Sequence, residues 1–555
     1  MSRRRAWAAA LALALAASGC SEAPTDAGRE ASGEAVAGTD AGSGTAGEAV
    51  AGEATAGGDA GEGAAATNAG AAGAAAEPDV PAETAVAASG EDAPAPSAAP
   101  SVGAAPSPEL RPERTTYDVE ATFHPAERRL TGVTVVTARN EAEVATSEAR
   151  LTAYLNAFHA DAVRARNPVL PEHRKRAYPA GTAALDGRLE ASSASVDGVP
   201  ATVERRGATL VVALPEPWAP GEWRRIELAW DATLPEVHHR FGMEGDAYWF
   251  GNAMPILAVF DGEWRDYAYE PVGDPFYSAI ADFRVRLTAP RDYAVVASGD
   301  ETAAPEGAAG DGFATTTVDA PRARDFAFAL GASHRVVGAE TAGGARVNVY
   351  YRDASEARAS AAAEAAAGMI DLLEGWVGAY PYREMDIFEN EMFVTGMEYP
   401  GLAFVRGDRL GDPDGVETVV HEVAHQWFYN AVGNDQVREP WLDESFATYM
   451  TDVYLLGDRL DATYAERLRA LRKGAAVGDA RAYDSWSAYW TGNYRKGALL
   501  LHALRGELGE EGFERFLKAY YERFRDGIAT EAAFVEAAAS AHGAPLDAFF
   551  EQWLP

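Results

Sequence analysis

The string HEVAH at positions 421–425 places two histidines four positions apart, with a glutamate directly after the first. If the surrounding string VETVVHEVAHQWFYNAV is helical, His421 and His425 lie on one face, and both imidazoles can reach one metal ion at about 2.0–2.1 Å. Glu422 then lies beside that face, where it can take a proton from a metal-bound water without ligating the metal. The pattern is typical of a hydrolytic zinc site.

A third ligand follows downstream, where Glu444 lies in the string WLDESFATYM, which we expect to be helical. Two histidines and one carboxylate leave the fourth tetrahedral position open for water, as hydrolysis by zinc requires. A closed structural site would need a fourth protein ligand, usually cysteine, and the single cysteine is the distant Cys20. We therefore predict one Zn²⁺ per chain, held by His421, His425 and Glu444, with Glu422 as the catalytic base.

Three separated strings resemble the motifs of the membrane alanine aminopeptidase (aminopeptidase N) family of gluzincin metallopeptidases. They are HEVAHQWFYN with WLDESFATYM, TGMEYPGLAFV upstream, and NYRKGALLL downstream, and the resemblance extends over about residues 115–555. It implies a zinc metalloaminopeptidase whose partners are peptides with a free N-terminus. It also implies that Tyr494 is catalytic, donating a hydrogen bond to the oxyanion that forms at the scissile carbonyl; a phenol that stays protonated suits this role.

The resemblance also implies where the substrate amine binds. Glu398, with its neighbours Gly396 and Met397, matches the family's Gly-x-Met-Glu-Asn motif and would receive the free α-amine, for which a carboxylate is a suitable acceptor. The motif differs here at Thr395 and Tyr399, which replace Gly and Asn. For a second amine-binding residue from the β-rich region, the candidate is Glu270 in YAYEPVGDPFY.

Three other functions stay open from the sequence. The same scaffold could be a zinc endopeptidase or could hydrolyse a non-peptide substrate, and a protein of another class would be an inactive, surface-anchored binding protein. The formal net charge of −36 argues against nucleic acid as a partner, because phosphates need clustered Lys and Arg. The pair His238-His239 is expected in a loop or at the surface, since neighbours in a strand point to opposite faces.

The N-terminal residues resemble a bacterial lipoprotein signal. Residues 1–20 combine three arginines, a short apolar run and small residues before Cys20, the expected lipidation site. Residues 21–110 contain no aromatic residue and are rich in Ala, Gly and Glu, so we expect a disordered linker. The predicted location is a bacterial cell envelope membrane (outer membrane or periplasm-facing), with the lipid as the only membrane contact.

The remaining chain is expected to be an α+β multidomain fold. Residues 111–340 contain short β-branched and aromatic runs between turns, which indicate an antiparallel β-sandwich or saddle. Residues 341–555 should form a mainly helical zinc peptidase domain with a short C-terminal helical extension, thermolysin-like according to the resemblance. Within it we expect a helix that ends before Pro381, two amphipathic helices broken at Gly512, and a helix N-cap at Thr530.

Overall fold

The computed structural model describes residues 113–181, 185–303, 310, 312–410, 415–471 and 477–554. Residues 1–112 lie outside these ranges. They include the predicted signal segment, Cys20 and the predicted linker. Within them, no helix combines the length and the apolar character needed to cross a bilayer.

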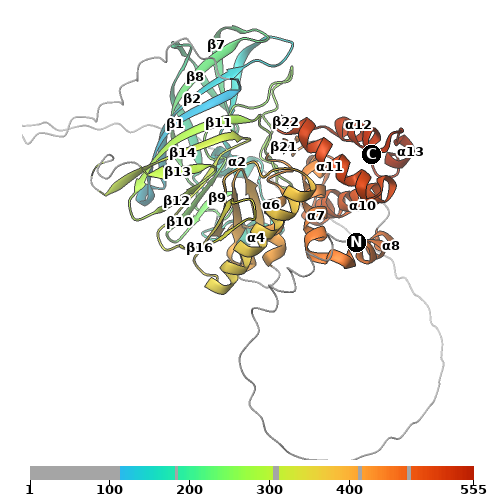
Figure 1. Cartoon of the computed structure of the whole chain (residues 1–555). Helices are drawn as coiled ribbons and strands as arrows, with labels where there is room; N and C mark the ends of the chain where they lie inside the picture. Colours follow the sequence, from blue (N-terminus) through green and yellow to red (C-terminus); the bar gives the residue numbers. More distant parts are fainter. Residues whose placement is uncertain are drawn as a thin grey trace, which may run out of the picture. The chain divides into compact units, whose positions relative to one another are not determined.

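The first half of the described chain consists mainly of β-strands, as the sequence predicts. Its largest sheet has eight strands, which lie side by side in Figure 1. In sheet order they are β13 (Asp300–Ala303), β14 (Phe313–Ala323), β11 (Ala281–Pro290), β1 (Thr115–His124), β2 (Arg129–Arg139), β8 (Trp223–Thr233), β4 (Arg188–Val196) and β5 (Val199–Ala201). The pairing is antiparallel except between β1 and β11, which run parallel, so the expectation of a purely antiparallel sheet is wrong at this one junction.

Two smaller sheets complete this half. One consists of β12 (Ala294–Ala297), β15 (Ala327–Gly331), β10 (Ala247–Gly251) and β9 (Phe241–Glu244), and the other of β3 (Thr146–Thr152), β7 (Thr209–Trp218) and β6 (Val203–Arg206). The strands alternate as half-buried strands should: in β1 the side chains of Tyr117, Val119, Ala121 and Phe123 are buried while their neighbours are more exposed. Short helices α2 (Ala160–Ala165) and α3 (Arg174–Ala177) interrupt the strands.

A five-stranded sheet begins the second half and separates two cores. Its order is β16 (Arg335–Glu340), β17 (Arg346–Tyr351), β18 (Glu384–Asn390), β20 (Leu402–Arg406) and β19 (Gly396–Tyr399). Met385, Ile387 and Val405 point into the core formed with the helices, whereas Phe388 and Phe404 point into the core of the β-rich half. Because neighbours along a strand face opposite sides, one sheet contributes to both cores.

Helices cover the other face of this sheet and form the rest of the chain. The long helix α4 (Glu356–Trp376) packs against α6 (Gly415–Ala424), as Figure 1 shows, and ends before Pro381 as predicted. The others are α5 (Gly407–Leu410), α7 (Trp441–Leu456), α8 (Leu460–Ala470), α9 (Trp486–Tyr489), α10 (Gly497–Leu508), α11 (Glu510–Phe524), α12 (Glu531–His542) and α13 (Asp547–Phe550). The π-helical segment η7 (Trp490–Lys496) leads into α10, and β21 (Val432–Gly433) pairs with β22 (Gly527–Ile528).

Two helix boundaries differ from the sequence-based expectation. The break between α10 and α11 lies at Gly509, not at Gly512, because Gly509 adopts φ 69°, a left-handed conformation that favours glycine. Helix α6 ends at Ala424, well before the predicted helical string ends. The predicted N-cap is confirmed: the hydroxyl of Thr530 accepts a hydrogen bond from the amide of Ala533 at 3.3 Å.

Candidate active site

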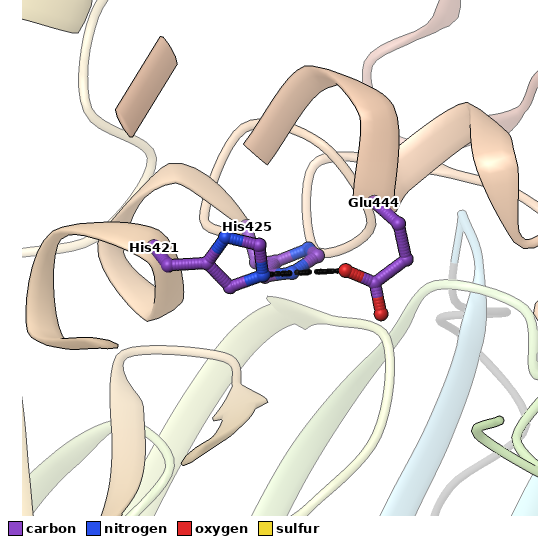
Figure 2. Close-up of side chains that lie close together, drawn as sticks. All are labelled: His421, His425 and Glu444. Carbon is purple, nitrogen blue, oxygen red and sulfur yellow. Dashed lines mark hydrogen bonds and ion pairs between the residues drawn. The ribbon is translucent and has the colours of Figure 1, made fainter. Parts of the chain in front are cut away.

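Three side chains from α6, the residue after it, and α7 converge at one point. His421 lies in the last turn of α6, His425 directly follows that helix, and Glu444 lies in the first turn of α7. The Nε2 atoms of the two histidines are 3.2 Å apart, and Oε2 of Glu444 lies 3.2 Å from Nε2 of His421 and 3.4 Å from Nε2 of His425. Figure 2 shows both rings and the carboxylate directed at this point.

This spacing fits a tetrahedral zinc ion. Ligand atoms about 2.0–2.1 Å from a tetrahedral zinc lie about 3.3 Å from one another, close to the three observed separations. Nδ1 of His425 donates to the carbonyl of Phe428 at 3.0 Å, which leaves Nε2 unprotonated and free to bind a metal. The structure thus brings together the three predicted ligands, although His425 lies just beyond the helix that was expected to include it.

A chain of polar side chains links the third ligand to the predicted amine-binding residue. The amide of Glu444 donates to Oδ1 of Asp443 at 2.8 Å, and Nε2 of Gln436 donates to Oδ2 of Asp443 at 2.9 Å. The same Nε2 donates to Oε1 of Glu398 at 2.8 Å. Gln436 therefore orients Glu398, and no sequence motif predicted this role.

The motif around Glu398 is a short strand, β19, whose two faces have different environments. Gly396 and Glu398 face the site: the ligand atoms of Glu398, Glu422 and His425 all lie within 4.8 Å of one another. Met397 and Tyr399 point the other way into the core of the β-rich half and are 1% and 0% exposed. Strand alternation turns the Met397 side chain away from the site, so a contact between Met397 and substrate would have to come from its backbone.

The core also accommodates the unusual Tyr399. A Cβ on Gly251 would lie 1.8 Å from the hydroxyl of Tyr399, so the absence of a side chain at Gly251 leaves room for the phenol. The carbonyl of Tyr399 accepts a hydrogen bond from Nε2 of Gln426 at 3.1 Å, and Oε1 of Gln426 accepts from the amide of Gly401 at 2.9 Å. These bonds attach β19 to the residues after α6.

Tyr494 lies at the site in the π-helical segment, a type of irregularity often found at functional sites. Its ring is stacked on His421, with centroids 5.7 Å apart, and its hydroxyl donates to Oε1 of Glu444 at 2.5 Å. Burial, with the charge of Glu444, raises the pKa of Tyr494 well above its ordinary value. The hydroxyl is therefore a hydrogen-bond donor at neutral pH.

The site holds several buried carboxyl groups. Burial raises the pKa of Glu422 to about 8 and that of Glu398 well above its ordinary value. Burial and the charge of Glu444 raise the pKa of Asp443 to about 7. Buried carboxylates need a compensating charge, and this arrangement suits a dication together with a cationic ligand.

The second predicted amine-binding residue forms an ion pair in this structure. Glu270 is buried, and its carboxylate is paired with Arg166, while Arg481 and Asp479 are among the other residues whose charges act on it. A direct contact between Glu270 and the substrate amine stays a prediction.

The β-rich half contributes a different carboxylate from the same loop. The charge of Asp274 contributes to the raised pKa values of Glu398, Glu422 and Tyr494. The charge of Glu444 contributes to the raised pKa of Asp274. Arg240, 1% exposed, donates to Asp274 at 2.7 Å. Nothing in the string GDPFY indicated that Asp274, like the candidate Glu270, would act on the active site.

His238 and His239 lie in the loop between β8 and β9, as one of the two expectations had it, but they are buried and not at the surface. Nδ1 of His239 lies 3.0 Å from the hydroxyl of Tyr269, and Nε2 of His238 lies 2.9 Å from a carboxylate oxygen of Glu244. Aromatic rings from Phe158, Phe241 and Phe393 surround His239. The pair therefore belongs to the core of the β-rich half.

Comparisons with known proteins agree with this geometry. Residues 361–553 match the peptidase family M1 domain. Aminopeptidase M1-A of Oryza sativa subsp. japonica is 30% identical over 243 residues, which are 39% of this chain and 27% of the relative. The chain thus matches only about a quarter of that relative's length.

Solved structures share the fold over most of the described chain. A mutant of the M1 zinc metallopeptidase from Deinococcus radiodurans superposes with a TM-score of 0.57 at 21% identity, covering 80% of this chain and 95% of that one. A mutant of the same enzyme in complex with a Tyr-Ser-Ala substrate superposes with a TM-score of 0.57 at 21% identity. That match covers 79% of this chain and 93% of the other. The β-rich half followed by a helical half is thus the architecture of a two-domain M1 metallopeptidase.

Proposed function

We propose that the chain is a zinc-dependent aminopeptidase that removes N-terminal residues from peptides, on the basis of the match between residues 361–553 and the peptidase family M1 domain. His421, His425 and Glu444 would hold the zinc ion, and the spacing of their donor atoms supports that assignment. The adjoining helices and five-stranded sheet support a thermolysin-like arrangement of the catalytic region.

The observation that carries the proposal is the position of Glu398. Its carboxylate is 4% exposed and lies within 4.8 Å of the functional atoms of Glu422 and His425. A buried carboxylate here needs a cationic partner, and the α-ammonium of a peptide supplies one. Because Glu398 lies so close to the metal ligands, a peptide anchored on it presents its first peptide bond to the zinc site.

The chain's own residues supply the other steps. When bound, zinc would polarise the scissile carbonyl and acidify the attacking water. Glu422 accepts the proton of that water and returns it to the leaving amine. Tyr494 donates a hydrogen bond to the oxygen that gains negative charge. Gln436 keeps the carboxylate of Glu398 directed at the amine, since it is bonded on its other side to Asp443.

The test compares free peptides with the same peptides acetylated at the N-terminus, with products identified by mass spectrometry. Acetylation removes the ammonium and leaves Glu398 unpaired, so free peptides should be cut at least about tenfold faster, and only after the first residue. Glu398→Gln should narrow that ratio by slowing the free peptides. Glu263→Gln, at a carboxylate of the β-rich half that is 79% exposed, should leave the ratio unchanged.

Equal cleavage of both peptide forms, or cleavage at internal bonds, would instead indicate an endopeptidase. No cleavage of any peptide by a protein that carries zinc would point to a non-peptide substrate or to a binding protein.

We also propose that the chain is exported and anchored through a lipid on Cys20. The support is the basic and apolar leader before this cysteine, which lies outside the described residues. Cys20→Ser should move the protein from the membrane fraction to the soluble fraction. An unchanged distribution would refute the anchor without affecting the enzymatic proposal.

A further inference from the structure

A second group of carboxylates lies away from the active site, at the junction of the β-rich half and the five-stranded sheet. It consists of Glu301 on β13 and of Glu384 and Asp386 on β18, and one oxygen from each residue lies within 4.8 Å of the others. Glu384 and Asp386 are 8% and 1% exposed. Carboxylates are common at protein surfaces, but three that converge in a buried position need an explanation.

Strand geometry places two of the three on one face. Glu384 and Asp386 are two positions apart and therefore point to the same side of β18, the side on which Phe388 enters the core of the β-rich half. Arg346 and Asn348 are their register partners on β17. Glu301 approaches from β13, and its Oε1 accepts from the amide of Ala297 at 2.7 Å.

The hydrogen bonds within the cluster leave part of its charge and one carboxylate oxygen without a partner among the described residues. Arg346 donates to Oε2 of Glu384 at 2.6 Å, but its side chain is 66% exposed and therefore screened by solvent. Asn348 donates to Oδ1 of Asp386 at 2.8 Å. Oδ2 of Asp386 is buried and has no hydrogen-bond partner among the described residues. Three carboxylates with one exposed guanidinium leave uncompensated negative charge and an unused ligand atom.

A cavity borders one member of the cluster, Glu384. This cavity of about 130 Å³ is lined by Glu384 together with Gly299, Asp300, Tyr382, Arg383 and Gly401. Such a volume holds a few water molecules, which complete the coordination of a metal ion bound by few protein ligands. The charges of the three carboxylates also act on Tyr350, where they add to the effect of burial in raising its pKa.

We propose that Glu301, Glu384 and Asp386 bind a hard divalent cation of the calcium class, which joins the β-rich half to the catalytic sheet. An all-oxygen set of carboxylates favours Ca²⁺ or Mg²⁺ over zinc, which prefers nitrogen and sulfur ligands. Calcium tolerates irregular geometry and mixed carboxylate and water ligands better than magnesium does. The site is structural, and it is independent of the proposed peptidase activity.

The competing explanation is that protons, not a metal, neutralise the cluster. Without a cation, burial raises the pKa of Glu301 to about 9 and that of Asp386 to about 8. The two explanations make opposite predictions for Asp386→Asn. If Asp386 is a metal ligand, the substitution removes the rise in Tm that calcium causes in the wild type. If Asp386 is instead a protonated carboxyl, the amide stabilises the protein, and calcium does not change the Tm of either form.

The experiment measures thermal unfolding of the zinc-saturated full chain during titration with CaCl₂ and, separately, MgCl₂. Calcium should raise the Tm by about 3–5 °C and then saturate, with a smaller effect of magnesium. Asp386→Asn and Glu301→Gln should each abolish the rise. Glu340→Gln, at an exposed carboxylate on β16 outside the cluster, should keep it.

Two results would overturn the proposal. One is the absence of any Tm change in the wild type up to about 10 mM calcium, well above the dissociation constants of weak calcium modules. The other is an equal rise in the wild type and in Asp386→Asn or Glu301→Gln, which would mean that calcium acts elsewhere. If Asp386→Asn does not fold, Glu301→Gln decides the question, because Glu301 is the less buried member of the cluster.

Discussion

Gly396 lies directly against the carboxyl group of Glu422: a Cβ at position 396 would come within 1.9 Å of Oε1 of that glutamate. The strand that carries Glu398 and the helix that carries the base thus approach so closely that only glycine fits between them. The same contact fixes the position of Glu422 relative to the metal ligands. A motif that resembles an amine-binding element therefore also positions the catalytic base.

Gly396→Ala should lower hydrolysis without removing the metal. The new methyl group must displace the Glu422 carboxyl, and a misplacement of about 1 Å at a reacting group can cost about 100-fold in rate. Zinc content, measured by elemental analysis, should stay at the wild-type value, because the three ligands are not touched. Gly375→Ala in α4, where a Cβ meets nothing within 4 Å, is the matched control. Equal activity of the two variants would contradict the proposed role of the contact.

Gly497→Ala should destabilise the junction of α7 and α10. Its Cβ would lie 1.7 Å from Oγ of Ser445, the residue after Glu444, and overpacking of this kind costs about 1–3 kcal/mol. Gly506→Ala in the same helix meets open space and should not destabilise. Denaturant unfolding of Gly497→Ala, Ser445→Ala and the double variant should reveal coupling, with the double variant less destabilised than the sum. If the destabilisation of the double variant equals the sum of the two single effects, positions 497 and 445 are not in contact.

Tyr494→Phe should reduce kcat by roughly 10²–10³ while changing KM little. The hydroxyl donates to Glu444 in this structure and, with substrate present, should donate to the developing oxyanion, an interaction made mainly in the transition state. Steady-state kinetics on a free peptide provides the measurement. A rise in KM at constant kcat would instead indicate that Tyr494 binds the ground state.

Asp325→Asn should alter how stability depends on pH. Burial raises the pKa of Asp325 to about 6, although Asn252 and Tyr429 donate to its carboxylate. Because the folded state holds this proton more tightly than the unfolded state, the wild type loses stability as the pH rises from about 4 to about 6. The difference from an ordinary pKa of 3.8 corresponds to about 3 kcal/mol.

An asparagine has no proton to lose. The stability of Asp325→Asn should therefore rise relative to that of the wild type between about pH 4 and 6, and this difference should persist at neutral pH. Denaturant unfolding at several pH values between about 4 and 8 measures the difference. A difference that does not change with pH would mean that Asp325 does not titrate there.

The sequence predicted the metal ligands because their chemistry follows from local spacing. His421 and His425 are one helical turn apart, and Glu444 lies in a second string with clear helical character. The division into a β-rich and a helical half followed from strand and helix patterns in the same way. Gly509 was missed as the helix break because neighbouring glycines are equivalent until backbone conformation separates them.

Residues that act through the tertiary fold were not accessible in this way. Asp274 and Glu270 lie in one loop, and only the folded chain shows that Asp274 faces the site while Glu270 pairs with Arg166. Gln436 has no motif, yet it connects Glu398 to Asp443. The parallel pairing of β1 with β11 joins strands far apart in sequence, which no local pattern encodes.

We propose that Glu422 acts as the base beside a zinc ion held by His421, His425 and Glu444. The most direct test measures zinc content and peptide hydrolysis on the same preparations of the wild type and of Glu422→Gln. We expect one zinc per chain in both and a loss of hydrolysis of about 10²–10⁴-fold in the variant. Near-normal turnover by the zinc-loaded variant, or hydrolysis by a wild type that binds no zinc, would contradict the account.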